Sequence, residues 1–308
     1  MKVPFVTCDV FTEEPFRGNP LLVVPDARGL TTAQMQSIAR EINYSESTFV
    51  LPPDDPKHAY RQRTFVPTKE IPYAGHPTVG TAVVMASLGR VGGALEADGT
   101  TAITIEVGFG PLRLELIRTA GVVSRVRMEQ GRPEWGAAVT SQESLGRVAA
   151  ALGVPFDALH PSLPAQAVST GNRFLMLPLS TVAAVSGAVA DTRMLNLVEN
   201  ELSVLGVFFF ASSEAGRFRA RMFAPGAGVP EDPATGSAAG PLGVYLALHG
   251  AVPGGLPLGR GHFWIDQGVE MGRASEIEVD VLVDGSGAPT GVRVAGSALL
   301  MMRGEISV

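Results

Sequence analysis

Two segments of the chain carry polar residues just before runs that are typical of buried helices. The segments read Gly75-His76-Pro77-Thr78-Val79-Gly80-Thr81-Ala82 and Asp232-Pro233-Ala234-Thr235-Gly236-Ser237-Ala238. The first N–H groups of a helix have no acceptor within the helix, and the helix dipole stabilises negative charge at that end. We therefore expect Thr235, Gly236 and Ser237 to offer N–H groups and a hydroxyl to an anion such as a substrate carboxylate.

His76 and Asp232 occupy the same place in these two segments, and each has a structural alternative. An isolated histidine is more often structural, but the position of His76 at the mouth of a helix, in a segment that recurs, favours a functional role. Aspartate is a common helix N-cap, so Asp232 can be a cap, a functional group or both. We expect the two helix ends to face each other across one anion-binding cleft.

Glu46 is the third candidate, and it lies in Asn43-Tyr44-Ser45-Glu46-Ser47-Thr48-Phe49, between a predicted helix and an apolar strand. A charge there is costly unless the site uses it, although a lone glutamate at a helix end is usually a surface residue. The aligned residue in the second copy is Gly206. The sequence thus predicts a single acid/base group, on one side only. Lys69 and Glu70, by contrast, are expected in a solvated turn.

The recurrence extends beyond these segments. Tyr60-Arg61-x-Arg63-x-Phe65-x-Pro67 returns as Phe218-Arg219-x-Arg221-x-Phe223-x-Pro225, and Gly18 to Pro25 return as Gly171 to Pro178. A helix predicted near residues 32 to 43 and a strand around Phe49 have counterparts in the same order. Surface loops tolerate the small differences in spacing. An internal duplication therefore predicts two similar domains with one active site built between them.

The remaining pattern indicates the fold class. Apolar residues cover nearly every face of the segment from Thr78 to Leu88, which predicts a buried central helix, and a second helix is predicted from Ser141 to Leu152. Few helices and hairpin-like spacing favour an α+β protein: two similar domains, each a barrel-like mixed or antiparallel sheet around a central helix. We assign residues 1–119 and 120–297 to the two domains. The segment 298–308 can return to the first.

Composition excludes several classes of function. The chain has 308 residues, of which 45% are hydrophobic and 18% charged, so it is a folded globule rather than a disordered chain. A net charge of −6 without a basic run argues against nucleic acid as a partner. The N-terminus lacks the apolar stretch of a signal peptide, and no run approaches the ~20 apolar residues of a membrane helix. We expect a cytoplasmic protein with no membrane partner.

Other chemistries leave little trace in the sequence. Cys8 is the only cysteine, which excludes an internal disulfide and a cysteine-cluster metal site. The three lysines lie in no setting that suggests a Schiff base; they are Lys2, Lys57 and Lys69. No zinc-protease, P-loop or dinucleotide-binding motif occurs. We therefore predict neither a metal nor a cofactor.

Several motifs, which occur in order and span nearly the whole chain, resemble the PhzF-like phenazine-biosynthesis family. They are Asp9-Val10-Phe11-Thr12, Gly18-Asn19-Pro20, Ser45-Glu46-Ser47-Thr48-Phe49, Arg63-x-Phe65-x-Pro67-x-x-Glu70-x-Pro72, Gly75-His76-Pro77-Thr78, Glu231-Asp232-Pro233-Ala234-Thr235-Gly236-Ser237-Ala238 and Gln267-Gly268-x-x-Met271-Gly272-Arg273-Ala274-Ser275. The resemblance implies the diaminopimelate-epimerase-like fold, with the active site in the cleft between two similar domains. It also implies cofactor-free isomerisation by proton transfer, and a homodimer.

The resemblance assigns roles residue by residue. Glu46 matches the family's acid/base glutamate, and the other matching active-site positions are His76, Asp232 and Ser237. The positions expected to contact substrate are Gly75, Gly236, Thr235 and Asn19. Fold relatives that racemise amino acids use two opposed cysteines, which the single Cys8 excludes. A carboxylate that moves a proton between carbons must take it and return it, so its pKa has to lie nearer neutrality than that of free glutamate.

Two hypotheses of different classes follow. The first is a cofactor-independent isomerase that acts on a small carboxylated, partly unsaturated metabolite, which is the partner we expect. The second is a non-catalytic metabolite-binding or interaction protein that retains the cleft. The presence of Glu46, His76, Asp232 and Ser237 together favours the enzyme. The sequence does not identify the substrate, because fold alone does not determine function.

Overall fold

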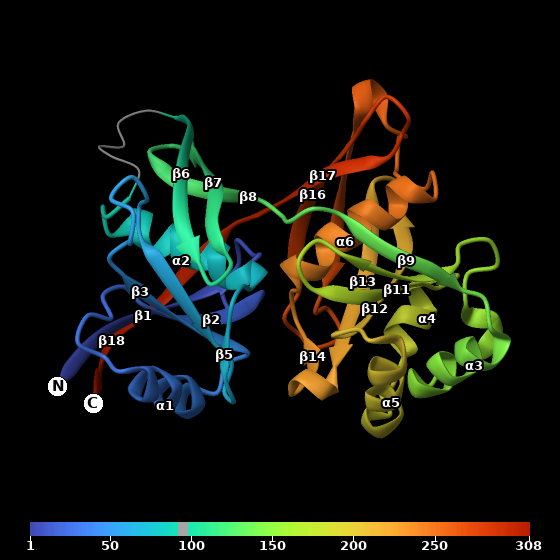
Figure 1. The fold of residues 1–308 in the computed structure, drawn as a ribbon, viewed down its shortest axis with the longest axis horizontal. Coiled ribbons are helices and arrows are strands. Elements are labelled where there is room, and N and C mark those ends of the chain that lie inside the picture. The colour runs from blue at the N-terminus through green and yellow to red at the C-terminus, as the bar shows by residue number, and fades with distance from the viewer. Residues whose placement is uncertain (92–97) are drawn as a thin grey trace. The chain divides into compact units, whose positions relative to one another are not determined.

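The computed structural model describes residues 1–91 and 98–308, and the chain divides into two compact units. The first unit comprises residues 1–129 and 295–308, and the second comprises residues 130–294 (Figure 1). Within the described residues, no helix is long and apolar enough to cross a membrane.

The described part of the first unit is a mixed sheet with two helices. Its strands are β1 (Lys2–Val10), β2 (Asn19–Val24), β3 (Glu46–Leu51), β4 (Arg61–Phe65), β5 (Glu70–Ile71), β6 (Gly99–Val107), β7 (Gly110–Thr119), β8 (Val122–Glu129) and β18 (Ala298–Ser307), and its helices are α1 (Thr32–Ile42) and α2 (Gly75–Ser87). β1 is antiparallel to β18 and β2, and β2 is parallel to β3. β3 pairs antiparallel with β4, β4 runs parallel to β6, and β6, β7 and β8 form an antiparallel meander.

The central helix of this unit is α2, and every residue from Gly75 to Ala86 is buried. A helix that is apolar on all sides is stable only inside a domain, because no face of it suits water. It packs closely against β1 and β2: a Cβ on Gly80 would lie 2.7 Å from side-chain carbons of Leu21 and Val10. Glycine at this position therefore sets how near the helix lies to the sheet.

The second unit has its own mixed sheet and four helices. Its strands are β9 (Glu134–Val139), β10 (Ala165–Ser169), β11 (Arg173–Pro178), β12 (Gly206–Glu214), β13 (Arg217–Ala224), β14 (Val229–Asp232), β15 (Arg260–Gln267), β16 (Ser275–Val283) and β17 (Pro289–Gly296), whose last two residues belong to the first unit. Its helices are α3 (Gln142–Ala151), α4 (Val182–Gly187), α5 (Thr192–Leu202) and α6 (Gly236–Leu248), with short 3-10 turns at Phe156–Ala158, Pro225–Ala227 and Pro257–Gly259. α6 is the buried central helix of this unit.

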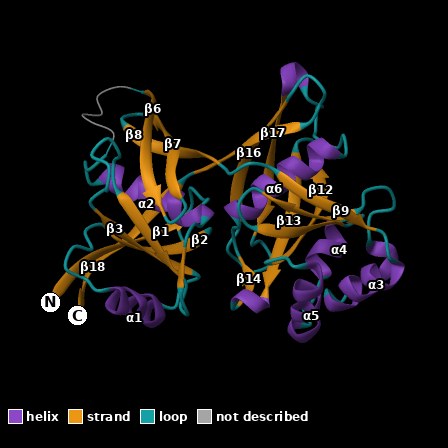
Figure 2. Cartoon of the chain, in the orientation of Figure 1, coloured by secondary structure: helices purple, strands orange, loops and turns teal. Residues whose placement is uncertain are grey.

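Strand pairing follows the same order in both units. The parallel pair β2/β3 has its counterpart in β11/β12, the antiparallel pair β3/β4 in β12/β13, and the parallel pair β4/β6 in β13/β15. A hairpin follows in each, β6/β7 and β15/β16. Figure 2 shows strands gathered around α2 in one unit and around α6 in the other. The expected fold class is confirmed: an α+β protein dominated by mixed sheets, with few helices.

The structure corrects two boundaries that were predicted from the sequence, one between the domains and one at the start of a helix. The sequence placed the domain boundary after residue 119, whereas the units divide after Glu129, because β8 pairs with β7 and so extends the first sheet. The helix expected from Thr78 begins at Gly75, so His76 lies in its first turn rather than before it. Proline is tolerated at Pro77 because the first-turn N–H groups need no partner within the helix. The terminal segment forms β18, which pairs with β1.

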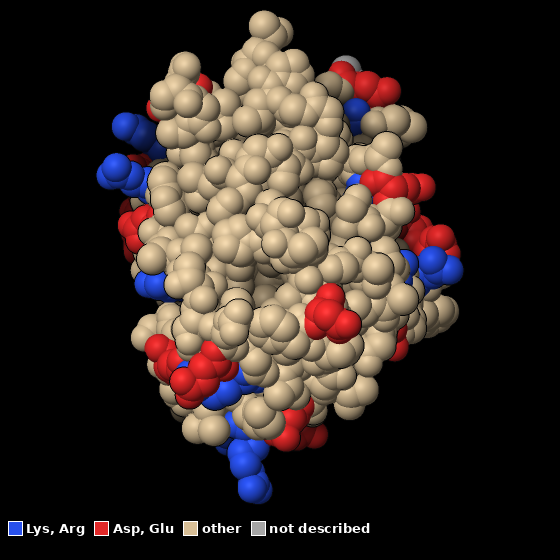
Figure 3. All heavy atoms as spheres, turned by 90° about the vertical axis from the view of Figure 1, so that its right-hand side faces the viewer, with Lys and Arg blue, Asp and Glu red and all other residues tan. Residues whose placement is uncertain are grey.

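Figure 3 shows the surface of the molecule after a turn of 90° from the view of Figure 1. Lys, Arg, Asp and Glu side chains gather mainly at its edges, and its centre carries few charges. Both signs of charge are mixed along these edges, so the described residues of this face form no continuous basic patch.

Candidate functional site

Glu46 and His76 form the core of a polar site in the first unit. Glu46 is the first residue of β3, and its Oε2 lies 3.5 Å from Nε2 of His76 in the first turn of α2. The His76 side chain is 4% exposed and that of Glu46 16%. Burial lowers the pKa of His76 to about 3, because an imidazolium in this interior would lose its hydration. The imidazole is therefore neutral at physiological pH.

Asn19 fixes which ring nitrogen of His76 carries the proton. Its side-chain Nδ2 lies 3.2 Å from His76 Nδ1, and its Oδ1 accepts a hydrogen bond of 3.1 Å from Ser45 Oγ. Since the amide nitrogen can only donate, His76 Nδ1 accepts and the proton of the neutral ring resides on Nε2. The Nε2–H group is thus directed to the side of Glu46. Sequence reasoning placed Asn19 among the substrate contacts and did not identify this role.

Sheet register explains why these residues meet. α1 ends at Ile42, its C-cap Asn43 adopts the left-handed conformation with φ 54°, and β3 begins three residues after Asn43. β2 and β3 are parallel, and Leu21 stands beside Glu46, so the starts of both strands lie at one edge of the sheet. Asn19 begins β2. The site therefore forms where two strand starts meet the first turn of the central helix.

A buried hydroxyl pair holds β3 against α2. Thr48 Oγ1 lies 2.8 Å from Thr81 Oγ1, and both residues are fully buried. Thr48 is two residues after Glu46 on the strand and therefore projects from the same face. Thr81 is on the helix that carries His76. This contact links the strand that carries Glu46 to the helix that carries His76.

In the second unit, a chain of hydrogen bonds converges on Asp232. Gln267, which is fully buried, donates from Nε2 to Thr235 Oγ1 at 2.9 Å, and Thr235 Oγ1 donates to Asp232 Oδ2 at 2.6 Å. Gln267 also accepts from Thr235 N at 3.0 Å and donates to the Asp232 carbonyl at 2.7 Å. The direction of the donors fixes Asp232 Oδ2 as an acceptor.

The helix-cap interpretation of Asp232 is wrong. Asp232 ends β14, and α6 begins only at Gly236, with Thr235 at the N-cap position and no side-chain capping bond. The two copies therefore differ in geometry: His76 lies within a helix turn, whereas Asp232 lies before one. Ser237 is half-buried in the first turn of α6, and Gly236 is buried beside it. Gly75 is buried at the start of α2.

The asymmetry between Glu46 and Gly206 has a steric cause. Gly206 begins β12 as Glu46 begins β3. A Cβ at Gly206 would lie 2.7 Å from the carbonyl oxygen of Phe223 and 2.8 Å from Cβ of Ala224. Real Cβ atoms do not approach backbone this closely, so the second unit has no room for any side chain at this place. A carboxylate here is confined to the first unit.

Each unit also contains a bidentate arginine–glutamate pair that sequence reasoning did not identify. Arg63 Nε donates to Glu70 Oε1 at 2.7 Å and its Nη2 to Oε2 at 2.6 Å. Glu70 is exposed as expected, but it lies in β5 rather than in a turn. Arg221 Nε and Nη2 donate to Glu231 at 2.8 and 3.0 Å. Glu231 directly precedes Asp232, so this pair fixes the short strand that ends in Asp232. The arginine motif that recurs in both halves of the sequence was the signal from which these pairs could have been predicted.

Cys8 takes no part in either site. It is fully buried in β1, and burial raises the pKa of its thiol far above the usual range. A thiol in this condition stays protonated and unreactive.

Comparisons with known proteins agree with this architecture. Residues 8–304 match the sequence model of the family described as phenazine biosynthesis-like protein (PhzC-PhzF). A relative from Pseudomonas fluorescens, named trans-2,3-dihydro-3-hydroxyanthranilate isomerase, is 37% identical over 303 residues, which cover 98% of each chain.

Two solved structures extend the comparison. The crystal structure of the Bacillus anthracis phenazine biosynthesis protein of the PhzF family aligns over all of both chains, with a TM-score of 0.86 and 25% identity. A probable proline racemase from Agrobacterium radiobacter K84 aligns over 99% of this chain and 93% of its own, with a TM-score of 0.67 and 13% identity. The second likeness shows the shared fold alone.

Proposed function

Because the chain belongs to the phenazine biosynthesis-like (PhzC-PhzF) family and is an isomerase, we propose that it acts without a cofactor and uses Glu46 as its acid/base group. The proposed reaction moves a proton from one carbon of a small carboxylated, partly unsaturated metabolite to another. Glu46 takes the proton as a carboxylate and returns it as the acid, so the group is restored after each turnover. Atoms balance within the substrate, and no redox partner is needed.

The single observation that carries this proposal is the pairing of Glu46 with a neutral, oriented imidazole. Glu46 Oε2 lies 3.5 Å from His76 Nε2, and Asn19 keeps the ring proton on that nitrogen. A neutral N–H group stabilises the carboxylate without the strong attraction of an imidazolium, which would hold the glutamate permanently ionised. A group that is restored after each turnover must exist both as the carboxylate and as the acid.

The remaining candidates have roles in binding. We propose that the first turn of α6, with Ser237 and the N–H groups that follow Thr235, receives the substrate carboxylate. Asp232, held as an acceptor by Thr235, is proposed to bind a substrate amine or hydroxyl. Gly75 and Gly236 are proposed to let backbone approach the substrate closely. That both units contribute to one substrate, and that the protein is a homodimer, stay predictions.

The name of the Pseudomonas fluorescens relative supplies a first probe, trans-2,3-dihydro-3-hydroxyanthranilate. We propose a substrate of the same chemical class: a small carboxylate with an amine or hydroxyl near a carbon–carbon double bond.

The decisive experiment measures uptake of solvent deuterium. The wild-type protein is incubated in D2O with the probe and with a panel of small unsaturated carboxylates, and incorporation is followed by mass spectrometry. We expect incorporation into at least one compound, with Glu46→Gln reducing it by at least 10²-fold, the lower range of general acid/base effects. Glu41→Gln, at an exposed position of α1, is the matched control and should keep full activity.

Two outcomes contradict the proposal. Full exchange by Glu46→Gln would remove Glu46 from the acid/base role. A wild-type protein that binds one of the carboxylates but exchanges deuterium into none would replace the enzyme with the non-catalytic binding protein.

A further inference from the structure

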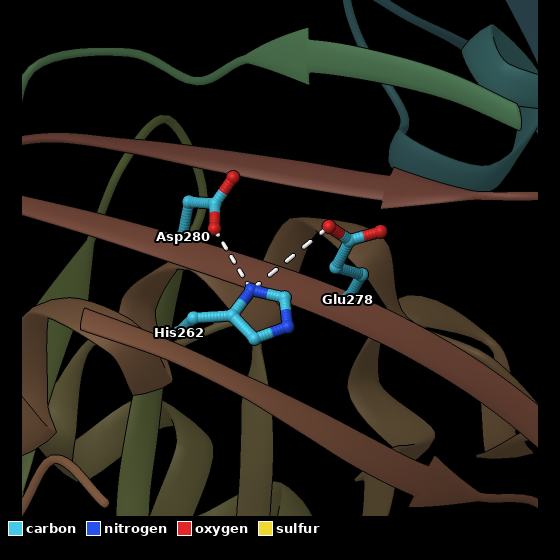
Figure 4. Close-up of side chains that lie close together, drawn as sticks. All are labelled: His262, Glu278 and Asp280. Atoms are coloured by element: carbon cyan, nitrogen blue, oxygen red, sulfur yellow. Dashed lines mark hydrogen bonds and ion pairs between the residues drawn. The ribbon is translucent and has the colours of Figure 1, made fainter. Parts of the chain in front are cut away.

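Three side chains with metal-binding atoms lie together on the β15/β16 hairpin of the second unit, and the proposed reaction uses none of them. His262 on β15 stands opposite Asp280 on β16, and Glu278 precedes Asp280 by two residues. Residues two apart on a strand, and residues opposite each other, project from the same face of a sheet. In Figure 4, Nδ1 of the imidazole is turned toward both carboxylates.

The separations of the three donor atoms match those around a small cation. His262 Nδ1 lies 2.9 Å from Asp280 Oδ1 and 3.9 Å from Glu278 Oε1, and one ligand atom from each of the three residues lies within 4.8 Å of the other two. Tetrahedral ligands about 2.1 Å from a zinc ion are separated by about 3.4 Å. The two observed distances from Nδ1 lie on either side of this value, so small changes in the side-chain torsion angles bring each carboxylate oxygen to a ligand separation from the imidazole.

Charge and accessibility also suit a divalent cation. Two carboxylates and one neutral imidazole together supply two negative charges. The Glu278 side chain is 8% exposed, whereas His262 is 48% and Asp280 28% exposed, so an ion can enter from solvent and reach the buried carboxylate. Each carboxylate has two oxygens and can bind the ion through one while the other keeps a protein contact.

Neighbouring residues orient the imidazole. Trp264 meets the His262 ring edge-on, with centroids 5.6 Å apart and an interplanar angle of 90°. Trp264 is in turn covered by the guanidinium of Arg217, 5.7 Å from its ring centroid, and stands opposite Glu278 in the hairpin. Packing of this kind restricts ring rotation, and second-layer contacts that restrict a ligand raise metal affinity.

We propose that His262, Glu278 and Asp280 bind a zinc ion and thereby link β15 to β16. An imidazole with two carboxylates favours zinc over magnesium and calcium, which prefer oxygen ligands alone. The far end of the same hairpin carries Gln267 and Ser275, which hold the backbone around Asp232 and Pro233. With three protein ligands and a water molecule as the fourth, the ion links the two strands of the hairpin that supports this segment. The site is independent of the proposed reaction.

The alternative is a simple ion pair between a protonated His262 and the two carboxylates. The first unit offers a matched comparison, because His58 Nδ1 lies 2.8 Å from Glu106 Oε1 and belongs to no group of three ligands among the described residues. A variant at His58 therefore removes a histidine–carboxylate pair without touching the proposed zinc site.

The test is isothermal titration of the EDTA-treated full-length chain with zinc chloride, with magnesium chloride as a separate arm. We expect one equivalent of zinc with a Kd below about 10 µM, so that 100 µM zinc raises the melting temperature by mass action. His262→Ala and Asp280→Asn should each weaken zinc binding at least tenfold and abolish the thermal shift. His58→Ala should bind zinc as the wild type does, and magnesium should produce no shift.

Equal zinc binding by wild type and both variants would place the ion elsewhere and overturn the proposal. No binding by the wild type at 100 µM zinc would leave the ion pair as the correct description. Asp280→Asn changes no volume at a partly exposed position, so it keeps the test interpretable if His262→Ala folds poorly.

Discussion

Replacement of Gln267 by leucine tests the hydrogen-bond chain at Asp232 without knowledge of the substrate. Gln267 is fully buried and makes hydrogen bonds to Thr235 N, Thr235 Oγ1 and the Asp232 carbonyl. Leucine has a similar size but no polar atoms. Gln267→Leu therefore leaves a buried N–H and a buried carbonyl without this partner, and it frees the Thr235 hydroxyl to turn away from Asp232.

The expected loss of stability follows from these contacts. A buried backbone group that loses its hydrogen bond costs about 1–3 kcal/mol, so two such groups cost about 2–6 kcal/mol. Burial of a leucine in place of the amide recovers part of this, and we expect a net loss of about 3 kcal/mol in the free energy of unfolding. With a urea m-value of about 2 kcal/mol/M, the unfolding midpoint should fall by about 1.5 M.

Tryptophan fluorescence reports on the relevant unit alone, because both tryptophans, Trp135 and Trp264, lie within residues 130–294. Gln166→Leu is the matched control: Gln166 is also buried, but it holds only one backbone group, the Gly136 carbonyl, together with His249. The control should lose less than half as much stability and keep any deuterium exchange activity. A midpoint for Gln267→Leu that equals that of the control would refute the assigned role of Gln267.

Further predictions concern the first-unit site and the asymmetry between the units. Burial holds the pKa of His76 near 3 against 6.5 when unfolded, so the unfolded chain binds more protons between these values and stability is lost as pH falls. The free energy of unfolding, measured by urea unfolding followed by circular dichroism, should fall between pH 6.5 and pH 4 by about 3 kcal/mol more in the wild type than in His76→Gln. Equal losses in the two proteins would contradict the neutral imidazole. Gly206→Ala should destabilise the second unit by about 1–3 kcal/mol, because its Cβ would meet the Phe223 carbonyl at 2.7 Å. An unchanged tryptophan-monitored midpoint would show that the backbone there yields easily.

Local patterns explain which elements could be predicted. The central helix α2 and the amphipathic helix α1 follow from the spacing of apolar residues and from the Thr31–Gln34 capping box, which the structure contains. β15 was not predicted, although Gly261, Phe263, Ile265 and Gln267 alternate as buried residues. A glycine and a glutamine in buried positions weakened the alternation of apolar and polar residues that identifies a strand.

The candidate site residues were predicted as a set, but their geometry was not. Motif order selected Glu46, His76 and Asp232 as candidates, because these residues stand at element boundaries in a repeated pattern. The expected positions within the elements were wrong in part: His76 lies inside α2, and Asp232 ends a strand rather than capping a helix. Helix boundaries depend on backbone hydrogen bonds that a sequence pattern fixes only to within a few residues.

The sequence by itself determined the duplication, the fold class and the family, because apolar periodicity and ordered motifs are local properties of the chain. Only the tertiary structure decided which polar groups are partners. Asn19 meets His76 across 57 positions, and Gln267 meets Asp232 across 35. Such contacts depend on strand register and on the depth at which a helix packs, and one residue of register moves a side chain to the opposite face of a sheet. The protonation of the imidazole and the orientation of the carboxylates are set at that level.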